Sequence, residues 1–330
     1  MISLDFELHW GVRDKHAAAS GYTASLLGAR EAIPRMLDLF TEYGISATWA
    51  TVGFLFAESS EELQLFHPEV RPAYEDTRLD PYAEPVGPDE ARDPIHFAPT
   101  LIRLIDSAPG QEVATHTYSH FYCLEAGAGE EAFRQDIASA QAIARARGID
   151  LRSIVLPRNQ WNPRFKKILS QAGLECYRGN QPGWMYEASS TDTETRLKRL
   201  SRLIDAHVPL TDWGGARWRD LTAGAHPRDV PATCFLRSVS QGSGMVNRLR
   251  LRRITAGLDR AAREGRLFHL WWHPHNFGSH TTENLCFLRS VLDQYRRLVS
   301  EQGMRSLTML EASRCPAPPV ALTKVVSSHE

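Results

Sequence analysis

The feature that most constrains the fold of this chain is a repeated alternation between short apolar runs and longer amphipathic segments. The apolar runs predict strands, namely Ile2–Phe6, Ala47–Val52, Glu112–Thr115, Ser153–Leu156, Glu175–Tyr177, Leu267–Trp272 and Ser306–Leu310. Helical spacing between them predicts helices over Ala29–Tyr43, Glu130–Arg147, Asn162–Ala172, Arg248–Glu264 and Glu283–Glu301, and one that ends at Ile102–Ser107. Strands and helices that alternate in this way predict an α/β fold with a mainly parallel sheet buried by helices.

About seven strands can form either an open sheet or a barrel, and in both the reactive residues collect where strands end. The 330 residues suffice for one large domain or two smaller ones, and no clear boundary divides them. Residues 59–94 are rich in Pro, Glu and Asp and show little periodicity. A stretch of this kind predicts a lid, an insertion or a disordered segment.

The composition excludes several classes of function. A net charge of −1 provides no basic surface for a nucleic acid partner. The chain has no apolar run of about 18 residues, so we expect no membrane span. Five dispersed cysteines indicate free thiols in a reducing compartment. Because no basic and apolar leader precedes the first strand, we expect a cytoplasmic protein.

Two carboxylates occupy the end of the first predicted strand. Asp5 and Glu7 are two residues apart, so on a strand their side chains would point to the same side. One could bind a metal ion while the other accepts a proton from an attacking water. The structural alternative is a carboxylate that caps a helix or pairs with Arg13.

Two histidines end the third predicted strand. Among 13 histidines, a pair at the spacing of His116 and His120 can arise by chance, and a packed or surface pair is the structural alternative. Their place at a strand end, together with the acids near Asp5, favours a divalent metal site. Two imidazoles and a carboxylate suit Zn²⁺ first, with nickel, cobalt and iron as alternatives.

Four short motifs, in order along the chain, resemble those of the polysaccharide deacetylase family. The catalytic region of this family is called the NodB homology domain and is similar to carbohydrate esterase family 4. The motifs are Ser3-Leu4-Asp5-Phe6-Glu7, His116-Thr117-Tyr118-Ser119-His120, Leu156-Pro157-Arg158-Asn159 and Leu270-Trp271-Trp272-His273-Pro274. The resemblance implies a distorted (β/α)7-type barrel with helices outside. It also implies metal-dependent hydrolysis of an acetyl group on a sugar.

The resemblance implies a role for each motif residue. Glu7, His116 and His120 would be metal ligands, and Asp5 the catalytic base, although the family's usual adjacent aspartates leave Asp5 open as a ligand. Arg158 would pair with Asp5 and keep it ionised, unless it is a solvated loop arginine. His273 would be the catalytic acid, unless it packs beside its two neighbouring tryptophans.

The resemblance also implies the organisation and substrate of the protein. We expect residues 1–315 to form a single deacetylase-like catalytic domain with the insertion near 59–94, and residues 316–330 to form a loose tail. The substrate would be an acetylated sugar or polysaccharide precursor. Because aromatic faces suit sugar rings, we also expect two or three of the tryptophans in predicted loops to line the cleft, with ordinary packing as the alternative for each. Those tryptophans are Trp10, Trp161, Trp184, Trp213 and Trp218.

Two alternative functions stay open. The first is hydrolysis of another C–N bond by a deformylase or a cyclic amide or ureide hydrolase. The second is a non-catalytic carbohydrate-binding protein on the same scaffold. The presence of a base and an acid beside the ligand pair counts against the second, because binding alone needs neither.

Overall fold

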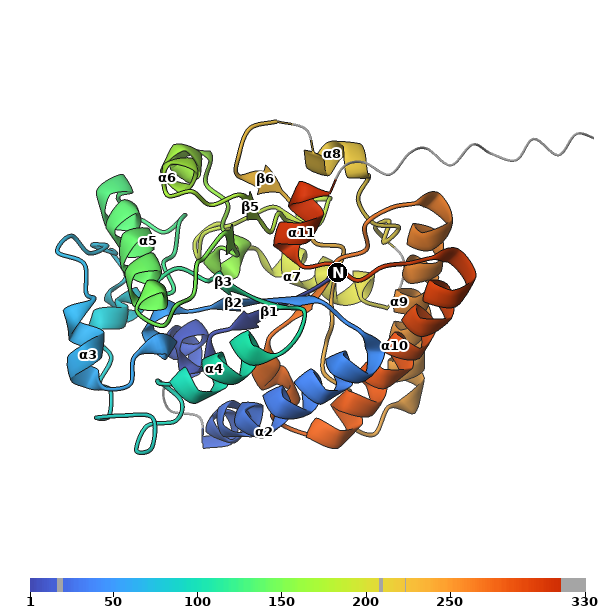
Figure 1. Cartoon of the computed structure of the whole chain (residues 1–330), viewed down its shortest axis with the longest axis horizontal. Coiled ribbons are helices and arrows are strands. Elements are labelled where there is room, and N and C mark those ends of the chain that lie inside the picture. The colour runs from blue at the N-terminus through green and yellow to red at the C-terminus, as the bar shows by residue number, and fades with distance from the viewer. Residues whose placement is uncertain (17–19, 208–209, 223, 316–330) are drawn as a thin grey trace, which may run out of the picture.

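The computed structural model describes residues 1–16, 20–207, 210–222 and 224–315, and the predicted C-terminal tail at 316–330 lies outside them. Its centre is one curled sheet of eight strands in the order β6-β5-β4-β3-β2-β1-β8-β7, with every named pairing parallel (Figure 1). The strands are β1 (Ile2–Phe6), β2 (Ala47–Thr51), β3 (Gln111–Thr115), β4 (Ser153–Ile154), β5 (Cys176–Tyr177), β6 (Arg228–Asp229), β7 (Cys234–Phe235) and β8 (Leu270–Trp272). Since the outer strands β6 and β7 do not pair with each other in the described chain, the sheet is an open half-barrel.

Helices surround this sheet on the outside, with α9 and α10 at one end and α3 and α5 at the other (Figure 1). The α-helices are α1 (Arg13–His16), α2 (Ser20–Tyr43), α3 (Ser60–Leu65), α4 (Pro99–Ser107), α5 (Glu130–Arg145), α6 (Lys166–Gln171), α7 (Arg196–Asp205), α8 (Trp218–Thr222), α9 (Gly244–Glu264), α10 (Thr281–Gln302) and α11 (Met309–Arg314). Short 3-10 helices are η1 (Leu8–Gly11), η2 (Gly53–Phe56), η3 (Thr77–Leu79), η4 (Pro81–Ala83), η5 (Pro157–Asn159), η6 (Pro163–Phe165), η7 (Trp184–Tyr186) and η8 (Pro274–Phe277). This arrangement confirms the predicted barrel-type α/β fold.

The first strand lies in the middle of the sheet, between β2 and β8. All five of its residues are buried, including Ser3 and Asp5. Central parallel strands are covered on both faces, which explains why the rest of the strand is apolar. A carboxylate in such a strand needs a partner, because an unpaired buried charge is costly.

Two glycines fix the segment that follows β8 against α2. A Cβ added to Gly28 of α2 would lie 2.0 Å from the backbone oxygen of Gly278, and one added to Gly278 would lie 1.8 Å from the oxygen of Ser25. No larger residue fits such a close approach of two backbones. The contact seats η8, which follows His273 directly, against α2.

Three expectations about the strands differ from the structure. The strand predicted at Ser306–Leu310 is wrong, because Thr308 caps α11 there and forms a capping box with Glu311. Strands β6 and β7 were not predicted. Each has two residues, which is too short for an alternating pattern to show.

The irregular segment 59–94 contains α3, η3 and η4 and folds back on itself through a bridge between Ser59 and Asp89. Arg30 of α2 holds its far end through an ion pair with Glu90 and hydrogen bonds to two backbone oxygens. Over the described ranges, the chain contains no helix with the length and apolar character that crossing a membrane requires.

Candidate active site

A cleft of about 730 Å³ lies at the ends of the central strands, where the predicted reactive residues collect. Its lining includes Asp5, Glu7, His120, Arg158 and His273. They belong to or follow β1, β3, η5 and β8, so segments far apart in the sequence converge on one edge of the sheet. Convergence at the carboxyl ends of parallel strands is the arrangement expected for this class of fold.

The Glu7 carboxylate faces two imidazoles. Its Oε2 lies 3.1 Å from Nε2 of His120 and 3.3 Å from Nε2 of His116. These ligand atoms all lie within 4.8 Å of one another, and all three residues are buried. One carboxylate oxygen and two imidazole nitrogens at this spacing are a suitable donor set for a divalent metal ion.

Hydrogen bonding prepares His116 to be a ligand, and burial keeps His120 neutral. Nδ1 of His116 lies 2.8 Å from the carbonyl oxygen of Val155, which can only accept, so Nδ1 carries the proton. Nε2 of His116 therefore presents a lone pair, and it is buried without a hydrogen-bond partner among the described residues. Burial lowers the pKa of His120 to about 3, which keeps this imidazole neutral at neutral pH. A neutral imidazole oriented by a second hydrogen bond is the form that binds metals.

Gly11 makes room for the Glu7 carboxylate. A Cβ added at Gly11 would lie 1.9 Å from the carboxyl carbon of Glu7 and 2.0 Å from one of its oxygens. Real Cβ atoms do not approach other atoms so closely, so any other residue at this position would displace the carboxylate. The structure therefore links the position of Glu7 to the η1 turn that follows it.

The Asp5 carboxylate is held by an arginine that the sequence analysis did not select. Arg178 donates from both terminal nitrogens to Asp5, at 2.6 and 2.7 Å, and its side chain is fully buried. It also donates to Ser3 and Asn159 and lies over the ring of Trp271. Burial raises the pKa of Asp5, but Arg178, together with His116 and His273, outweighs this effect and holds the pKa below its usual value.

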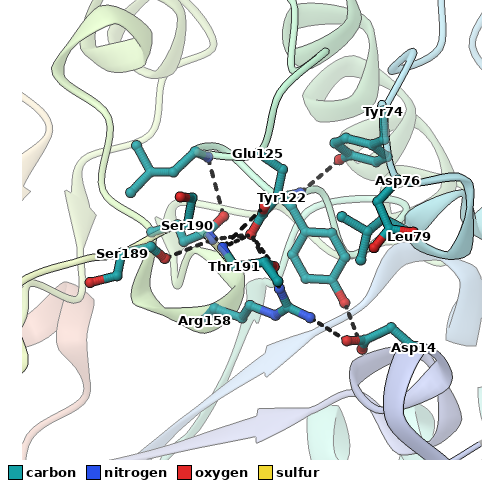
Figure 2. Close-up of polar contacts among 12 residues, drawn as sticks. Asp14, Tyr74, Asp76, Leu79, Tyr122, Glu125, Arg158, Ser189, Ser190 and Thr191 are labelled. Atoms are coloured by element: carbon teal, nitrogen blue, oxygen red, sulfur yellow. Dashed lines mark hydrogen bonds and ion pairs between the residues drawn. The ribbon is translucent and has the colours of Figure 1, made fainter. Parts of the chain in front are cut away.

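The predicted pair between Arg158 and Asp5 is therefore wrong. Arg158 donates instead to Asp14 at 2.5 Å and to Glu125 at 3.2 Å, and it lies over the ring of Tyr122 (Figure 2). The physical reason is the left-handed backbone of the η5 turn, with φ of 54° at Arg158 and 51° at Asn159. This turn directs Arg158 to the loops at the rim and leaves Asn159 to contact Arg178.

On the other side of Glu7 lies a second pair of histidines. Nε2 of His273 is 3.5 Å from Oε1 of Glu7 and 3.7 Å from Oδ2 of Asp5. The His273 side chain is 24% exposed and so is open to the cleft. His275, two residues further along, is buried and stacks on His273 with the ring centroids 5.1 Å apart. Burial lowers the pKa of His275 to about 4.

A signal for Arg178 was present in the sequence. It follows β5 directly, so the rule that selected His116 and His273 also applied to it. The family motif points instead to Arg158 as the partner of Asp5. His275 could have been found from its two-residue offset from His273.

The tryptophans divide between the cleft and the interior. Trp213 lines the cleft, as does Trp271, which was not among those predicted to do so. Trp10 is a packed residue and not a cleft residue, because it is fully buried and donates to the carbonyl oxygen of His96. Trp161 stacks on Tyr177 with the ring centroids 3.9 Å apart.

Comparison with known families agrees with this geometry. A family model described as polysaccharide deacetylase matches residues 21–177, a range that contains the second and third motifs. Residues 21–177 therefore belong to the polysaccharide deacetylase family, and the resemblance predicted from the sequence is confirmed. This match supports a deacetylase function. No curated protein sequence shows significant similarity to the chain.

Two solved structures share the fold. A Mycobacterium smegmatis protein, provisionally named a polysaccharide deacetylase, is 16% identical with a TM-score of 0.55, over 94% of this chain and 87% of that one. A 4-alpha-glucanotransferase from Thermococcus litoralis is 12% identical with a TM-score of 0.53, over 97% of this chain and 42% of that one. Since these two names describe different reactions, the shared fold alone does not define the activity.

Proposed function

We propose that this protein is a metal-dependent hydrolase that removes an acetyl group from an N-acetylated or O-acetylated sugar. The observation that carries the proposal is the placement of Glu7 between the His116–His120 pair and the Asp5–Arg178 pair, with His273 open to the cleft. Glu7, His116 and His120 would hold one divalent ion, zinc first, with nickel, cobalt and iron as alternatives. When bound, the ion would polarise the acetyl carbonyl and lower the pKa of water.

Two residues of the chain would move protons. Asp5 would accept a proton from the attacking water, and Arg178 would keep Asp5 ionised for this step. His273 would donate a proton to the leaving nitrogen or oxygen, for which its partial exposure to the cleft is suited. Arg158 is a positioning residue in this account, because its contacts are with the loops at the rim of the cleft.

The cleft suits a sugar with an anionic substituent. Its aromatic lining includes Tyr186, Trp213, Phe235 and Trp271, which offer flat apolar faces to a sugar ring. Arg237 also lines the cleft and forms no ion pair with the described residues, and burial lowers its pKa. A half-buried cation with no carboxylate partner among the described residues favours an anionic ligand. These features support a nucleotide-linked or lipid-linked precursor of a polysaccharide or glycoconjugate.

In this proposal, residues 1–315 act as one catalytic domain with an insertion near 59–94, and the protein acts in the cytoplasm on a biosynthetic precursor. The test is acetate release from a panel of acetylated sugars and nucleotide sugars, with and without added zinc. Formyl-sugars and small cyclic amides in the same panel separate deacetylation from the hydrolysis of other C–N bonds. Sugar binding without acetate release in zinc-replete buffer would contradict the proposal and favour a binding protein.

A further inference from the structure

A second cluster of histidines and carboxylates lies just behind the candidate active site. His9 belongs to η1, Glu84 follows η4, and His96 precedes α4, so three separate segments meet here. Although His9 is two residues from Glu7, none of the three belongs to the described lining of the 730 Å³ cleft. The cluster is therefore separate from the site proposed for the reaction. We call these three residues the His9 cluster.

The ligand atoms of the His9 cluster are close enough to share an ion. Oε1 of Glu84 lies 2.8 Å from Nε2 of His9 and 3.8 Å from Nε2 of His96. All three atoms lie within 4.8 Å of one another. Zinc–ligand bonds of about 2.1 Å in tetrahedral geometry place neighbouring ligand atoms about 3.4 Å apart. The observed separations lie on both sides of this value, so small side-chain rotations would suffice.

His96 provides an independent sign that the cluster binds a ligand. Its Nδ1 lies 2.8 Å from each carboxylate oxygen of Asp93, which can only accept, so Nδ1 carries a proton. Its Nε2 is buried and has no hydrogen-bond partner in the part of the chain that the structure describes, while the whole residue is 6% exposed. At 3.8 Å from Glu84, a protonated Nε2 would be too distant to donate a hydrogen bond. In a typical metal-binding histidine, one ring nitrogen donates a hydrogen bond to a carboxylate and the other is free to bind the metal.

The charge and access of the cluster suit a divalent ion. Glu84 and Asp93 place two carboxylates against the two imidazoles, and a divalent cation would balance their charge. The Glu84 side chain is 22% exposed, so water can reach the site and complete the coordination. We propose that His9, Glu84 and His96 bind a second divalent transition-metal ion of the zinc class, with Asp93 orienting His96.

Such an ion would join the η1 turn, which follows Glu7, to Glu84 in the irregular segment and to His96 just beyond its end. Two weaker links already connect η1 to the residues that follow the irregular segment, since Trp10 donates to the carbonyl oxygen of His96 at 3.0 Å and the His9 amide donates to the carbonyl oxygen of Ile95 at 3.3 Å. An ion at the His9 cluster would add a link between η1 and this part of the chain. Its role is therefore structural, in support of the position of Glu7.

The test begins with the full chain from which metal has been removed. After equilibrium dialysis against Zn²⁺, elemental analysis measures how many zinc ions each chain binds. We expect two equivalents for the wild type, one for His96→Ala, one for His116→Ala and none for the double variant. His67→Ala is the matched control, because His67 lies in the same segment and in none of the described clusters of possible ligands, and it should keep both equivalents. Zinc should raise the melting temperature of His116→Ala but not that of the double variant.

The single variants separate this proposal from the proposed function. If His96→Ala binds as much zinc as the wild type, the second site is overturned, whatever His116→Ala does. If instead His116→Ala binds as much as the wild type while His96→Ala loses one equivalent, only the active-site ligands are wrong. Glu84→Gln, which keeps the size of the side chain, covers the case in which His96→Ala does not fold. It should weaken zinc binding at one site by about 10-fold or more.

Discussion

Asp5 and Glu7 lie two residues apart at the end of the same strand and are almost equally buried, yet their surroundings are opposite. Asp5 contacts a fixed cation, since both its oxygens accept hydrogen bonds from Arg178. Glu7 faces imidazoles, two of which present nitrogens within 3.3 Å of its Oε2. An arginine cannot give way to a metal ion without leaving a buried charge, whereas neutral imidazoles can share one. In the function proposed above, this difference favours Glu7 as the metal ligand and Asp5 as the proton acceptor.

The largest effects are expected when either carboxylate is replaced, and the zinc content of the two variants should differ. Glu7→Gln should lose one equivalent of zinc and about 10³-fold in turnover, because several kcal/mol of stabilisation by the ion would be lost. Asp5→Asn should lose about 10³-fold in turnover as well, through loss of the base, but keep the zinc content of the wild type. Zinc analysis and acetate release on the same preparations measure both quantities. A loss of zinc in Asp5→Asn alone would reverse the assignment.

The second prediction concerns the cation beside Asp5. In the wild type Asp5 stays ionised at low pH, because Arg178 holds its pKa below the usual value. In Arg178→Met the effect of burial is opposed only by the smaller effects of His116 and His273, so the pKa of Asp5 rises and activity is lost at higher pH as the pH falls. We expect the acid limb of the pH–activity profile to move up by about 2 pH units, the typical effect of an adjacent opposite charge.

Arg178→Lys is the matched variant, since it keeps the charge but loses the two-point contact. Its acid limb should move less than that of Arg178→Met. Circular dichroism melts should accompany both variants, because Asp5 without a partner is expected to destabilise the fold by about 3–5 kcal/mol near neutral pH. Identical profiles in the wild type and Arg178→Met would show that Asp5 is not the base.

A smaller effect is expected from the two stacked histidines. His273→Ala should lower turnover by about 10²-fold through loss of the acid, with the zinc content unchanged. His275→Ala removes a buried neighbour of His273 to which the proposal gives no proton-transfer role, so turnover should fall less. Substrates with better leaving groups should recover activity in His273→Ala but not in Asp5→Asn. Loss of zinc in both histidine variants would indicate that the ion binds on the other side of Glu7.

The smallest effect is expected at Arg158. Because it contacts Asp14 and Glu125 at the rim and not Asp5, Arg158→Met should leave the acid limb of the pH profile unchanged. Its effect should appear mainly in KM, through the loops that form the cleft wall. A shift of the acid limb as large as that in Arg178→Met would contradict the assignment of the two arginines.

The sequence predicted the elements that an apolar pattern marks and the polar residues that stand at the end of such an element. Long strands such as β1 and the histidines at the end of β3 are of this kind. The choice between Arg158 and Arg178 depends on a left-handed turn at residues 158 and 159, which no apolar pattern encodes. Strands of two residues, such as β6 and β7, depend on their neighbours in the sheet more than on their own sequence.

The most direct test of this account is an anomalous difference map from crystals of the full chain grown with zinc. The account predicts a peak bound by Glu7 and by Nε2 of His116 and His120, with Asp5 still paired to Arg178. A peak bound by Asp5 with Arg178 displaced, or one shared by Glu7, His273 and His275, would contradict it.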